Sequence, residues 1–212
     1  MNCCQCQGIE DLFNDSLVNK ELAQYRVKGP AKTTRWMIDA IKAEGVEGLH
    51  LLDIGGGVGA VQHALIEAGV KEATDIDASK AYLRAAKDEA KRRGIAERTR
   101  FFHGNFVEAA SQIPPAEIVT LDRVVCCYPD MENLVGLSAA RATKVYGLVY
   151  PRDAWWVKLG MAFLNTFFRL QRKPFRTFVH PTTVVDSIVR QQGLRRKFFR
   201  QTLVWQVVVY GR

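Results

Sequence analysis

The stretch from Leu51 to Ala60 constrains the fold of this chain more than any other. An apolar run reaches Asp53, four glycines fall within residues 55–59, and helix-forming residues begin at Val61. This order predicts a strand, a tight turn and the start of a helix. Glycine suits such a turn because a backbone without Cβ turns sharply and lets a ligand lie against it. The first N–H groups of a helix also lack helical partners, so we expect this turn to bind a ligand.

Short apolar runs recur along the chain and alternate with helical patterns. The predicted strands are Leu49–Ile54, Glu72–Ile76, Arg100–His103, Ile118–Val125 and Lys144–Tyr150. Helices are predicted at Val61–Ala68, Lys80–Arg93 and Thr182–Gln192, with Ser79 as an N-cap. Strands that alternate with helices at this spacing indicate a doubly wound parallel sheet.

The two ends of the chain depart from this alternation. Ile9–Glu44 has a helical pattern that Gly29-Pro30 breaks into two pieces. Lys197–Tyr210 is apolar with a polar break near Gln201-Thr202, which predicts two adjacent strands and hence an antiparallel hairpin. The predicted fold class is α/β: a Rossmann-like, doubly wound, seven-stranded sheet, mostly parallel, that ends in an antiparallel hairpin.

Length and composition fit one domain. With 212 residues, 48% of them hydrophobic, the chain can bury one good core. We expect residues 1–212 to form one domain, with a helical cap over residues 1–45 and a helical insertion over residues 151–181 that acts as a substrate lid. Met1–Ile9 lacks the basic start and apolar run of a signal peptide, so we expect a cytoplasmic protein.

The net charge of +8 is unevenly placed along the chain. Residues 151–212 hold 12 Lys and Arg against 2 Asp and Glu, whereas residues 1–150 hold 18 against 20. The same 62 residues hold 11 of the 21 aromatic residues. A basic and aromatic segment suits an acidic partner with apolar surface. A solvated basic face over an aromatic core is the alternative interpretation.

Two types of cofactor compete for the glycine turn. Gly55-x-Gly57-x-x-Ala60, with Asp77 22 residues after Gly55, satisfies the dinucleotide fingerprint. Asp53-x-Gly55-x-Gly57-x-Gly59 is the more complete pattern, and it resembles motif I of the class I S-adenosylmethionine-dependent methyltransferases. That resemblance implies S-adenosyl-L-methionine as the cofactor and methyl transfer as the activity.

Three further stretches carry the same resemblance. Residues 75–79 resemble the second motif of the family, in which an acid, here Asp77, takes both ribose hydroxyls. Residues 102–106 resemble the loop over the adenine, with Asn105 where the family usually has Asp. Residues 120–130 resemble the fourth-strand motif, which meets the methionine end of the cofactor and the substrate. The cofactor-binding residues that this implies are Asp53, Gly55, Gly56, Gly57, Gly59, Asp77, Ala78, Asn105, Phe106 and Asp122.

The acceptor pocket is expected beyond the fourth and fifth strands. Many small-molecule O-methyltransferases of this family carry a histidine just before the proline of the fourth-strand motif, where this chain has Cys127-Tyr128-Pro129. We therefore take Tyr128 and His180 as candidate catalytic residues. A plain helix-start residue before Pro181 is the other interpretation of His180. The candidate substrate contacts are Cys127, Arg152, Trp155 and Arg176.

The insertion gives the acceptor site its individual character. Tyr128-Pro129, the aromatic insertion and then His180 before a final helix and hairpin resemble the magnesium-protoporphyrin O-methyltransferases, whose substrate is a flat hydrophobic ring with propionates. Within residues 154–173, Lys158, Asn165, Arg169 and Arg172 form one narrow polar stripe. The wide apolar side could pack on the sheet, cover a flat substrate, or lie on a membrane surface.

The five cysteines fall in two clusters, Cys3, Cys4 and Cys6 and the pair Cys126 and Cys127. Their odd number indicates reduced thiols. One interpretation is that the cysteines are buried and act as small hydrophobic residues. The other is that Cys126 and Cys127 line a pocket for a thiol or metalloid substrate, joined by Cys3, Cys4 and Cys6 if the N-terminus folds over it. The spacing is not that of a structural zinc site, and we predict no metal.

We predict methyl transfer to a small molecule, aromatic or anionic and hydrophobic, on oxygen rather than sulfur. The basic last segment leaves a nucleic-acid methyltransferase as an alternative. A non-catalytic cofactor-binding or membrane-peripheral protein is a second alternative, and a nicotinamide dehydrogenase is a third. The sequence predicts no oligomeric state.

Overall fold

A computed structural model describes residues 4–212 of the chain, with side chains from residue 8 onward. The elements, in chain order, are α1 (Cys4–Leu12), α2 (Asp15–Lys28), α3 (Lys32–Ala43), β1 (His50–Ile54), α4 (Ala60–Glu67), β2 (Glu72–Asp77), α5 (Lys80–Arg92), η1 (Ala96–Arg98), β3 (Thr99–His103), α6 (Phe106–Ala109), η2 (Ala110–Gln112), β4 (Ala116–Asp122), η3 (Val125–Cys127), α7 (Met131–Arg141), β5 (Ala142–Pro151), α8 (Trp155–Leu170), α9 (Thr182–Gln191), β6 (Arg195–Gln201) and β7 (Trp205–Gly211).

The strands form one seven-stranded sheet in the order β3-β2-β1-β4-β5-β7-β6. β1 pairs in parallel with β2 and β4, and the parallel pairing continues to β3 on one side and β5 on the other. β7 runs antiparallel to both β5 and β6. This is the predicted doubly wound sheet with a terminal antiparallel hairpin. Because the chain order reverses between β1 and β4, the carboxyl ends of these strands open onto a crevice where ligands bind in such folds.

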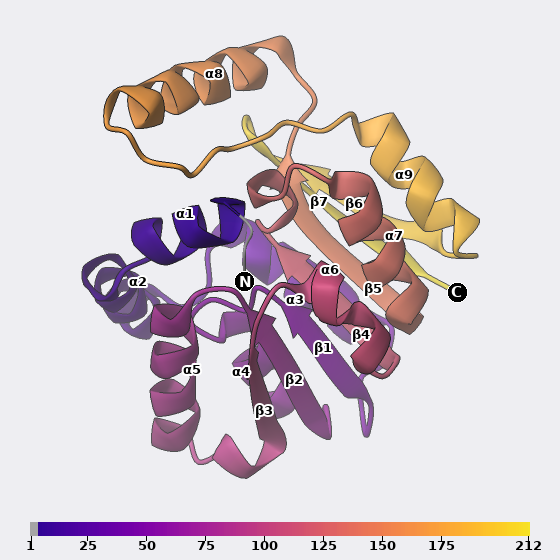
Figure 1. Cartoon of the computed structure of the whole chain (residues 1–212). Coiled ribbons are helices and arrows are strands. Elements are labelled where there is room, and N and C mark those ends of the chain that lie inside the picture. Colours follow the sequence, from indigo (N-terminus) through magenta and orange to yellow (C-terminus); the bar gives the residue numbers. More distant parts are fainter. Residues whose placement is uncertain (1–3) are drawn as a thin grey trace.

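Helices cover both faces of the sheet (Figure 1). Successive side chains of β1 point to opposite faces of the sheet. Leu51 therefore packs with α3 and α4 in the core on one face, and Leu52 packs with α7 and α9 in the core on the other face. α3 approaches β5 closely enough that a Cβ on Gly147 would lie 2.9 Å from Ile41 and 3.1 Å from Met37. Both faces of the central strands are therefore buried, as a parallel sheet requires.

The structure corrects the predicted end of the fourth strand. β4 ends at Asp122, and Val125 belongs to the short helix η3 rather than to the strand. Arg123 leaves the strand direction with φ 63°, a left-handed backbone conformation that is rare outside glycine. The apolar character of Val124 and Val125 suits a buried turn as well as a strand, so the hydrophobic pattern alone did not mark the boundary.

The helical run predicted as two pieces over Ile9–Glu44 has three, because the chain also leaves the helix between α1 and α2, where Asn14 begins a new one; most other elements follow the predicted ones with small shifts. Asn14 caps α2 by accepting from the Leu17 N–H at 3.2 Å, and Ser79 caps α5 by accepting from the Tyr82 N–H at 3.3 Å. α7 lies between β4 and β5 and is capped by Asp130; the sequence analysis assigned no helix there. Among the described residues, no helix is long and apolar enough to cross a membrane.

α8 lies apart from the α/β body, above α1 in the view of Figure 1. The strand-free segment 171–181 returns from α8 toward α9. The N-terminal cap and the insertion meet at Gly8, where an added Cβ would lie 2.7 Å from the Phe175 nitrogen. Two segments that are far apart in the sequence therefore close over the same end of the sheet.

Candidate active site

One cavity of about 780 Å³ lies at the carboxyl ends of β1, β2 and β4. Its floor consists of the lining residues in 53–57, 76–78, 104–106 and 122–124, which end strands or follow them. Its roof consists of the lining residues in 9–13, 161–168 and 175–177, from α1, α8 and the returning segment. This volume lies within the range of about 300–1,000 Å³ for small-molecule sites.

The glycine turn shapes the floor through its backbone. Gly55, Gly57 and Gly59 have φ of 68°, 58° and 82°, where a side chain would be strained. At Gly56 a Cβ would lie 2.2 Å from the Gln62 amide nitrogen and 2.8 Å from carboxylate oxygens of Asp53 and Asp75. Gly56 is therefore required by a buried polar cluster behind the turn, not by the turn conformation.

The N–H groups of the turn have protein partners. The Gly56 N–H donates to Asp75 Oδ1 at 3.2 Å, and the Gly57 N–H donates to Asp77 Oδ2 at 3.2 Å. Carboxylates of the next strand, β2, therefore fix the turn against the sheet. The unpaired N–H groups that the sequence analysis expected are those at the start of α4, which begins at Ala60, and these two bonds do not involve them.

The cluster behind the turn is acidic. Thr120 Oγ1 and Gln62 Nε2 donate to the two oxygens of Asp53 at 2.7 and 3.1 Å. Burial raises the pKa of Asp53 to about 7 and that of Asp77 to about 6, and it raises the pKa of Asp75 well above its usual range. A diphosphate placed here would meet carboxylates, which argues against a dinucleotide and favours a ligand with positive charge.

Asp77 is placed to bind hydroxyl groups of a ligand. Its carboxylate accepts from the Ser79 N–H at 2.8 Å and from the Gly57 N–H, yet it still lines the cavity. Each carboxylate oxygen can accept a further hydrogen bond. A ribose diol against Asp77 would therefore find acceptors already oriented by the backbone.

Asp122 and Arg123 form a long ion pair at the end of β4, and each keeps one buried atom that has no hydrogen-bond partner among the described residues. Thr34 Oγ1 donates to Asp122 Oδ2 at 2.6 Å, whereas Asp122 Oδ1 and Arg123 Nε, 3.9 Å apart, are buried without a hydrogen-bond partner among the described residues. Both residues line the cavity. Such a pair complements an amino-acid group, with its ammonium on Asp122 and its carboxylate on Arg123. The floor thus fits S-adenosylmethionine, which carries a ribose, an ammonium and a sulfonium.

Asn105 and Phe106 lie where an adenine was expected. Asn105 Oδ1 accepts from the Val107 N–H at 3.1 Å and so caps the short helix α6, while its Nδ2 donates to Glu108 Oε1 at 3.0 Å and to the Tyr128 hydroxyl at 3.1 Å. Ala78, Asn105 and Phe106 line the cavity together with nearly all the other predicted cofactor residues. Gly59 is the exception: it is the N-cap of α4 and is not a lining residue of the cavity.

The two candidate catalytic residues have different positions. Tyr128 lines the cavity, whereas His180 is not among the lining residues. His180 Nε2 donates to the Tyr128 carbonyl oxygen at 3.0 Å, and burial lowers the pKa of His180. The neutral imidazole therefore holds the backbone of Tyr128, and no described residue that lines the cavity is a histidine.

Of the four candidate substrate residues, the structure brings only Cys127 to the cavity. Arg152 donates to the Thr202 carbonyl oxygen at 3.0 Å and lies over the Trp156 ring, and Arg176 donates to the Phe175 carbonyl oxygen at 2.6 Å. Trp155 is 73% exposed on α8 and, like both arginines, is not a lining residue. The sequence placed these residues in the right segment but could not give the direction of their side chains.

Cys126 is buried and Cys127 is half-buried. The Sγ atoms of Cys126 and Cys127 lie 3.9 Å apart, and the contact with Cys126 together with burial raises the pKa of the Cys127 thiol. A thiolate nucleophile would need the opposite shift. Cys3 and the side chains of Cys4 and Cys6 lie outside the described residues, where no group of metal-ligating side chains could be sought; among the described residues there is none.

Sequence reasoning missed the cationic residues of the cavity. Arg123, Arg35, Lys28 and Lys32 line it, and the Arg123 guanidinium donates to Thr33 Oγ1 at 3.0 Å and stacks on Trp205. The left-handed backbone of Arg123 aims this side chain at the cavity from the end of β4, and strained conformations of this kind cluster at functional sites. The sequence signal that could have identified Arg123 was its position next to Asp122, directly after an apolar strand.

The roof is apolar and is held by few polar bonds. Met161, Leu164 and Phe168 of α8 face the cavity, and the Phe168 ring lies edge-on to Phe175 at 5.8 Å. The Asn165 amide donates to the Thr177 carbonyl oxygen at 2.7 Å and accepts from the Thr177 N–H at 2.8 Å. The Asn165 side chain therefore joins α8 to the returning segment through two hydrogen bonds to the backbone of Thr177.

Residues 52–150 match the protein family described as a methyltransferase domain. A search of curated proteins found no match. Among solved structures, the chain is similar to magnesium protoporphyrin IX methyltransferase of Synechocystis PCC 6803 with bound S-adenosylhomocysteine, at 17% identity and a TM-score of 0.75, covering 98% of this chain and 99% of that one. The same enzyme has also been solved with S-adenosylmethionine.

Two further structures share the architecture. An O-methyltransferase family protein of Burkholderia thailandensis has 16% identity and a TM-score of 0.67, covering 95% of this chain and 61% of that one. The YcgJ protein of Bacillus subtilis has 22% identity and a TM-score of 0.61, covering 80% and 70%. At these identities the likeness establishes the fold.

Proposed function

We propose that this class I S-adenosylmethionine-dependent methyltransferase methylates an oxygen of a small, hydrophobic, anionic molecule, specifically a carboxylate oxygen. The observation that carries this proposal is the composition of the cavity wall. An apolar roof faces a floor with an acidic cluster, cationic side chains lie between them, and no described lining residue is a histidine. Each part of this wall restricts the acceptor in a different way.

The roof restricts the body of the acceptor. Met161, Leu164, Phe168 and Phe175 present apolar atoms to the cavity, so an aromatic or aliphatic body is favoured by burial at about 25 cal/mol per Å². Arg35 and the lysines at positions 28 and 32 supply positive charge on the same wall. A carboxylate on the acceptor would pair with them, most specifically with the planar guanidinium of Arg35.

The missing histidine restricts the reacting group. A hydroxyl acceptor must lose a proton during transfer, which calls for a general base within hydrogen-bond reach. A carboxylic acid has a pKa of about 4 and is already ionised at neutral pH, so its methylation needs alignment and no base. The Cys127 thiol has a raised pKa, and the Tyr128 hydroxyl accepts from Asn105. The lining carboxylates Asp53 and Asp77 already accept from Thr120, Gln62 and backbone N–H groups of the floor, so neither is placed as a free base for the acceptor.

In this mechanism the chain orients and encloses the reactants. When bound, S-adenosylmethionine supplies an electrophilic methyl group on its sulfonium. Asp77 would accept from its ribose, and Asp122 and Arg123 would hold its amino-acid end. The Tyr128 hydroxyl faces the cavity near Asn105 and would orient the acceptor oxygen. The roof excludes water, which strengthens these charged contacts.

Transfer of labelled methyl groups tests the proposal. The protein is incubated with methyl-labelled S-adenosylmethionine and a fractionated cell lysate, and the Asp77→Asn variant is the control. We expect label in the solvent-extracted small molecules, and we expect mild alkali to release it as methanol, because methyl esters hydrolyse and methyl ethers do not. Alkali-stable label would refute the carboxylate acceptor, and label only in RNA or protein would refute the small-molecule acceptor.

A nucleic-acid methyltransferase is the second candidate. The exposed cations of β6 favour it, since Arg195, Arg196, Lys197 and Arg200 follow one another on the edge strand of the sheet. Label in RNA, together with binding to RNA that weakens as salt rises, would place this candidate first.

A further inference from the structure

α8 is apolar on two sides, and only one of them belongs to the cavity. At about 100° per residue, Val157, Met161, Leu164 and Phe168 share one side, where Val157 is 4% and Phe168 8% exposed. Lys158, Asn165 and Arg169 form the predicted narrow polar stripe beside them. The remaining side faces solvent, so it does not pack on the sheet, which was one of the three positions that the sequence analysis allowed for it.

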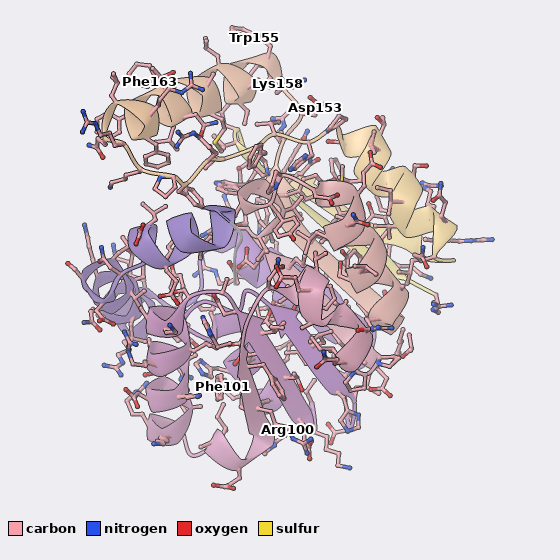
Figure 2. The ribbon with its side chains drawn as sticks, in the orientation of Figure 1. Arg100, Phe101, Asp153, Trp155, Lys158 and Phe163 are labelled. Atoms are coloured by element: carbon pink, nitrogen blue, oxygen red, sulfur yellow. The ribbon has the colours of Figure 1, made fainter. Side chains whose placement is uncertain are left out.

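The outer face of α8 consists of four large apolar residues at helical spacing. Trp155, Leu159, Phe163 and Leu170 are 73%, 64%, 78% and 78% exposed, and Figure 2 shows Trp155 and Phe163 pointing away from the body of the molecule. Leu203, 72% exposed in the turn of the β6–β7 hairpin, extends this face, because the Trp156 indole donates to the Leu203 carbonyl oxygen at 3.1 Å. Exposed apolar patches of this kind mark interaction surfaces.

The charge around the outer face has one sign. Residues 152–176 carry six cations and a single acid, Asp153, which pairs with Lys158 at 2.6 Å. The cations are Arg152, Lys158, Arg169, Arg172, Lys173 and Arg176. The partner of this face must therefore be apolar and anionic at once.

We propose that the outer face of α8 docks on the surface of a membrane that contains anionic phospholipid. Trp155, Leu159, Phe163 and Leu170 enter the region between headgroups and acyl chains, and the flanking cations contact the headgroup phosphates. With 16 residues, or roughly 24 Å at about 1.5 Å per residue, α8 is too short to cross a bilayer and lies in its surface.

Charge decides between the membrane and two other occupants. A second copy of the chain would bring another set of six cations against the first, which repels. A single-stranded nucleic acid would satisfy the cations, but it binds apolar surface by stacking on aromatic rings, and Leu159, Leu170 and Leu203 cannot stack. An anionic bilayer satisfies both the cations and the leucines.

The position of α8 connects this surface to the cavity. The inner side of the helix lines the cavity while its outer face lies on the membrane, so the two are separated by the width of one helix. A hydrophobic acceptor dissolved in the bilayer would reach the cavity past the roof without crossing bulk water. This last step rests on the proposed function; the docking does not.

Sedimentation with vesicles tests the docking without any measurement of activity. The full chain is mixed with vesicles of phosphatidylcholine alone or of phosphatidylcholine and phosphatidylglycerol in equal parts. We expect binding to the anionic vesicles, weakened by salt, with a blue shift of tryptophan fluorescence. Changing Trp155, Leu159, Phe163 and Leu170 together to Ser should weaken it about 100-fold, and Arg172→Gln or Lys173→Gln about fivefold each.

Matched controls lie elsewhere on the surface. Val27 is 82% exposed on α2, and Lys71 and Lys91 are exposed away from α8; Val27→Ser, Lys71→Gln and Lys91→Gln should leave vesicle binding unchanged. Absence of binding to anionic vesicles at low salt would overturn the proposal, as would binding that the four-residue variant retains. A dimer that this variant converts to a monomer would indicate a second copy, and RNA that displaces the vesicles would indicate a nucleic acid; either result also overturns it.

Discussion

The floor and the roof of the cavity are built by different interactions. In the floor, side-chain and backbone polar atoms bond to one another at defined distances, and the glycine turn is bonded to two carboxylates of β2. In the roof, apolar rings meet edge to edge, and polar connections such as those of Asn165 to Thr177 and of Ser79 to Phe13 are scattered between them. The floor therefore fixes the position of a ligand atom by atom, whereas the roof excludes water and selects by shape.

The largest effect should come from crowding the floor. In Gly56→Ala the new Cβ would meet Gln62, Asp53 and Asp75 below contact distance, so we expect a loss of about 2–3 kcal/mol of stability and no measurable binding of S-adenosylhomocysteine by calorimetry. Gly136→Ala is the matched control, because its Cβ would lie 3.7 Å from Ile188 in a helix. It should raise stability by about 0.5–1 kcal/mol. Equal behaviour of the two variants would contradict the crowding.

Removal of one charge from the floor should weaken cofactor binding strongly and the fold slightly, because one of the two backbone N–H groups on Asp77 also loses its acceptor. Asp77→Asn keeps the shape of the side chain but loses the charged acceptor, and charge-assisted hydrogen bonds contribute about 1.5–3 kcal/mol each. We expect binding of S-adenosylhomocysteine to weaken about 100-fold while the melting temperature stays within a few degrees. Asp88→Asn on the exposed side of α5 is the control. Unchanged affinity in Asp77→Asn would remove Asp77 from the site.

The pH dependence of cofactor binding should report the same residue. Burial raises the pKa of Asp77 to about 6, and the ionised form is the acceptor for hydroxyls. As pH falls through about 6 the carboxylate takes up a proton, so affinity for S-adenosylhomocysteine should fall about tenfold between pH 7 and pH 5. The Asp77→Asn variant should show no such fall over this range. A pH profile shared by both proteins would assign the titration to another group.

The smallest effect should come from the roof, and it should leave the cofactor alone. Leu164→Ala shortens a side chain that lines the cavity, so we expect about a fivefold rise in the amount of lysate acceptor needed for half-maximal methyl transfer. Leu159→Ala makes the same change on the outer face of the same helix and should leave that amount unchanged in the absence of vesicles. An equal effect of both substitutions would mean that α8 acts through its stability rather than through contact.

The sequence predicted the floor well because short-range chemistry determines it. Asp53, the glycines and Asp77 lie at strand ends or in the turn between strand and helix, and the alternation of strands with helices places these ends at one edge of the sheet. Nine of the ten predicted cofactor residues line the cavity. What the sequence did not give was the set of partners, such as the carboxylates that bind the turn N–H groups.

The roof could not be predicted in the same way because long-range contacts determine it. Nothing in the sequence near Gly8 indicates that Phe175 will lie against it. His180 has the spacing of a base but directs its Nε2 to a backbone carbonyl, and both sides of α8 are apolar, so periodicity could not tell which side faces the cavity. Arg123 was missed because its side-chain direction follows from a left-handed backbone conformation.

The bond between Asn165 and Thr177 has a consequence for the release of product. It joins two parts of the roof, α8 and the returning segment, to each other, so these two parts can move outward as one unit while the bond stays intact. Motions of this size take microseconds to milliseconds. The lifetime of the enclosed product would then depend on the contacts between this unit and the α/β body, such as the bond from the Trp156 indole to the Leu203 carbonyl oxygen, and the turnover number of the enzyme with it.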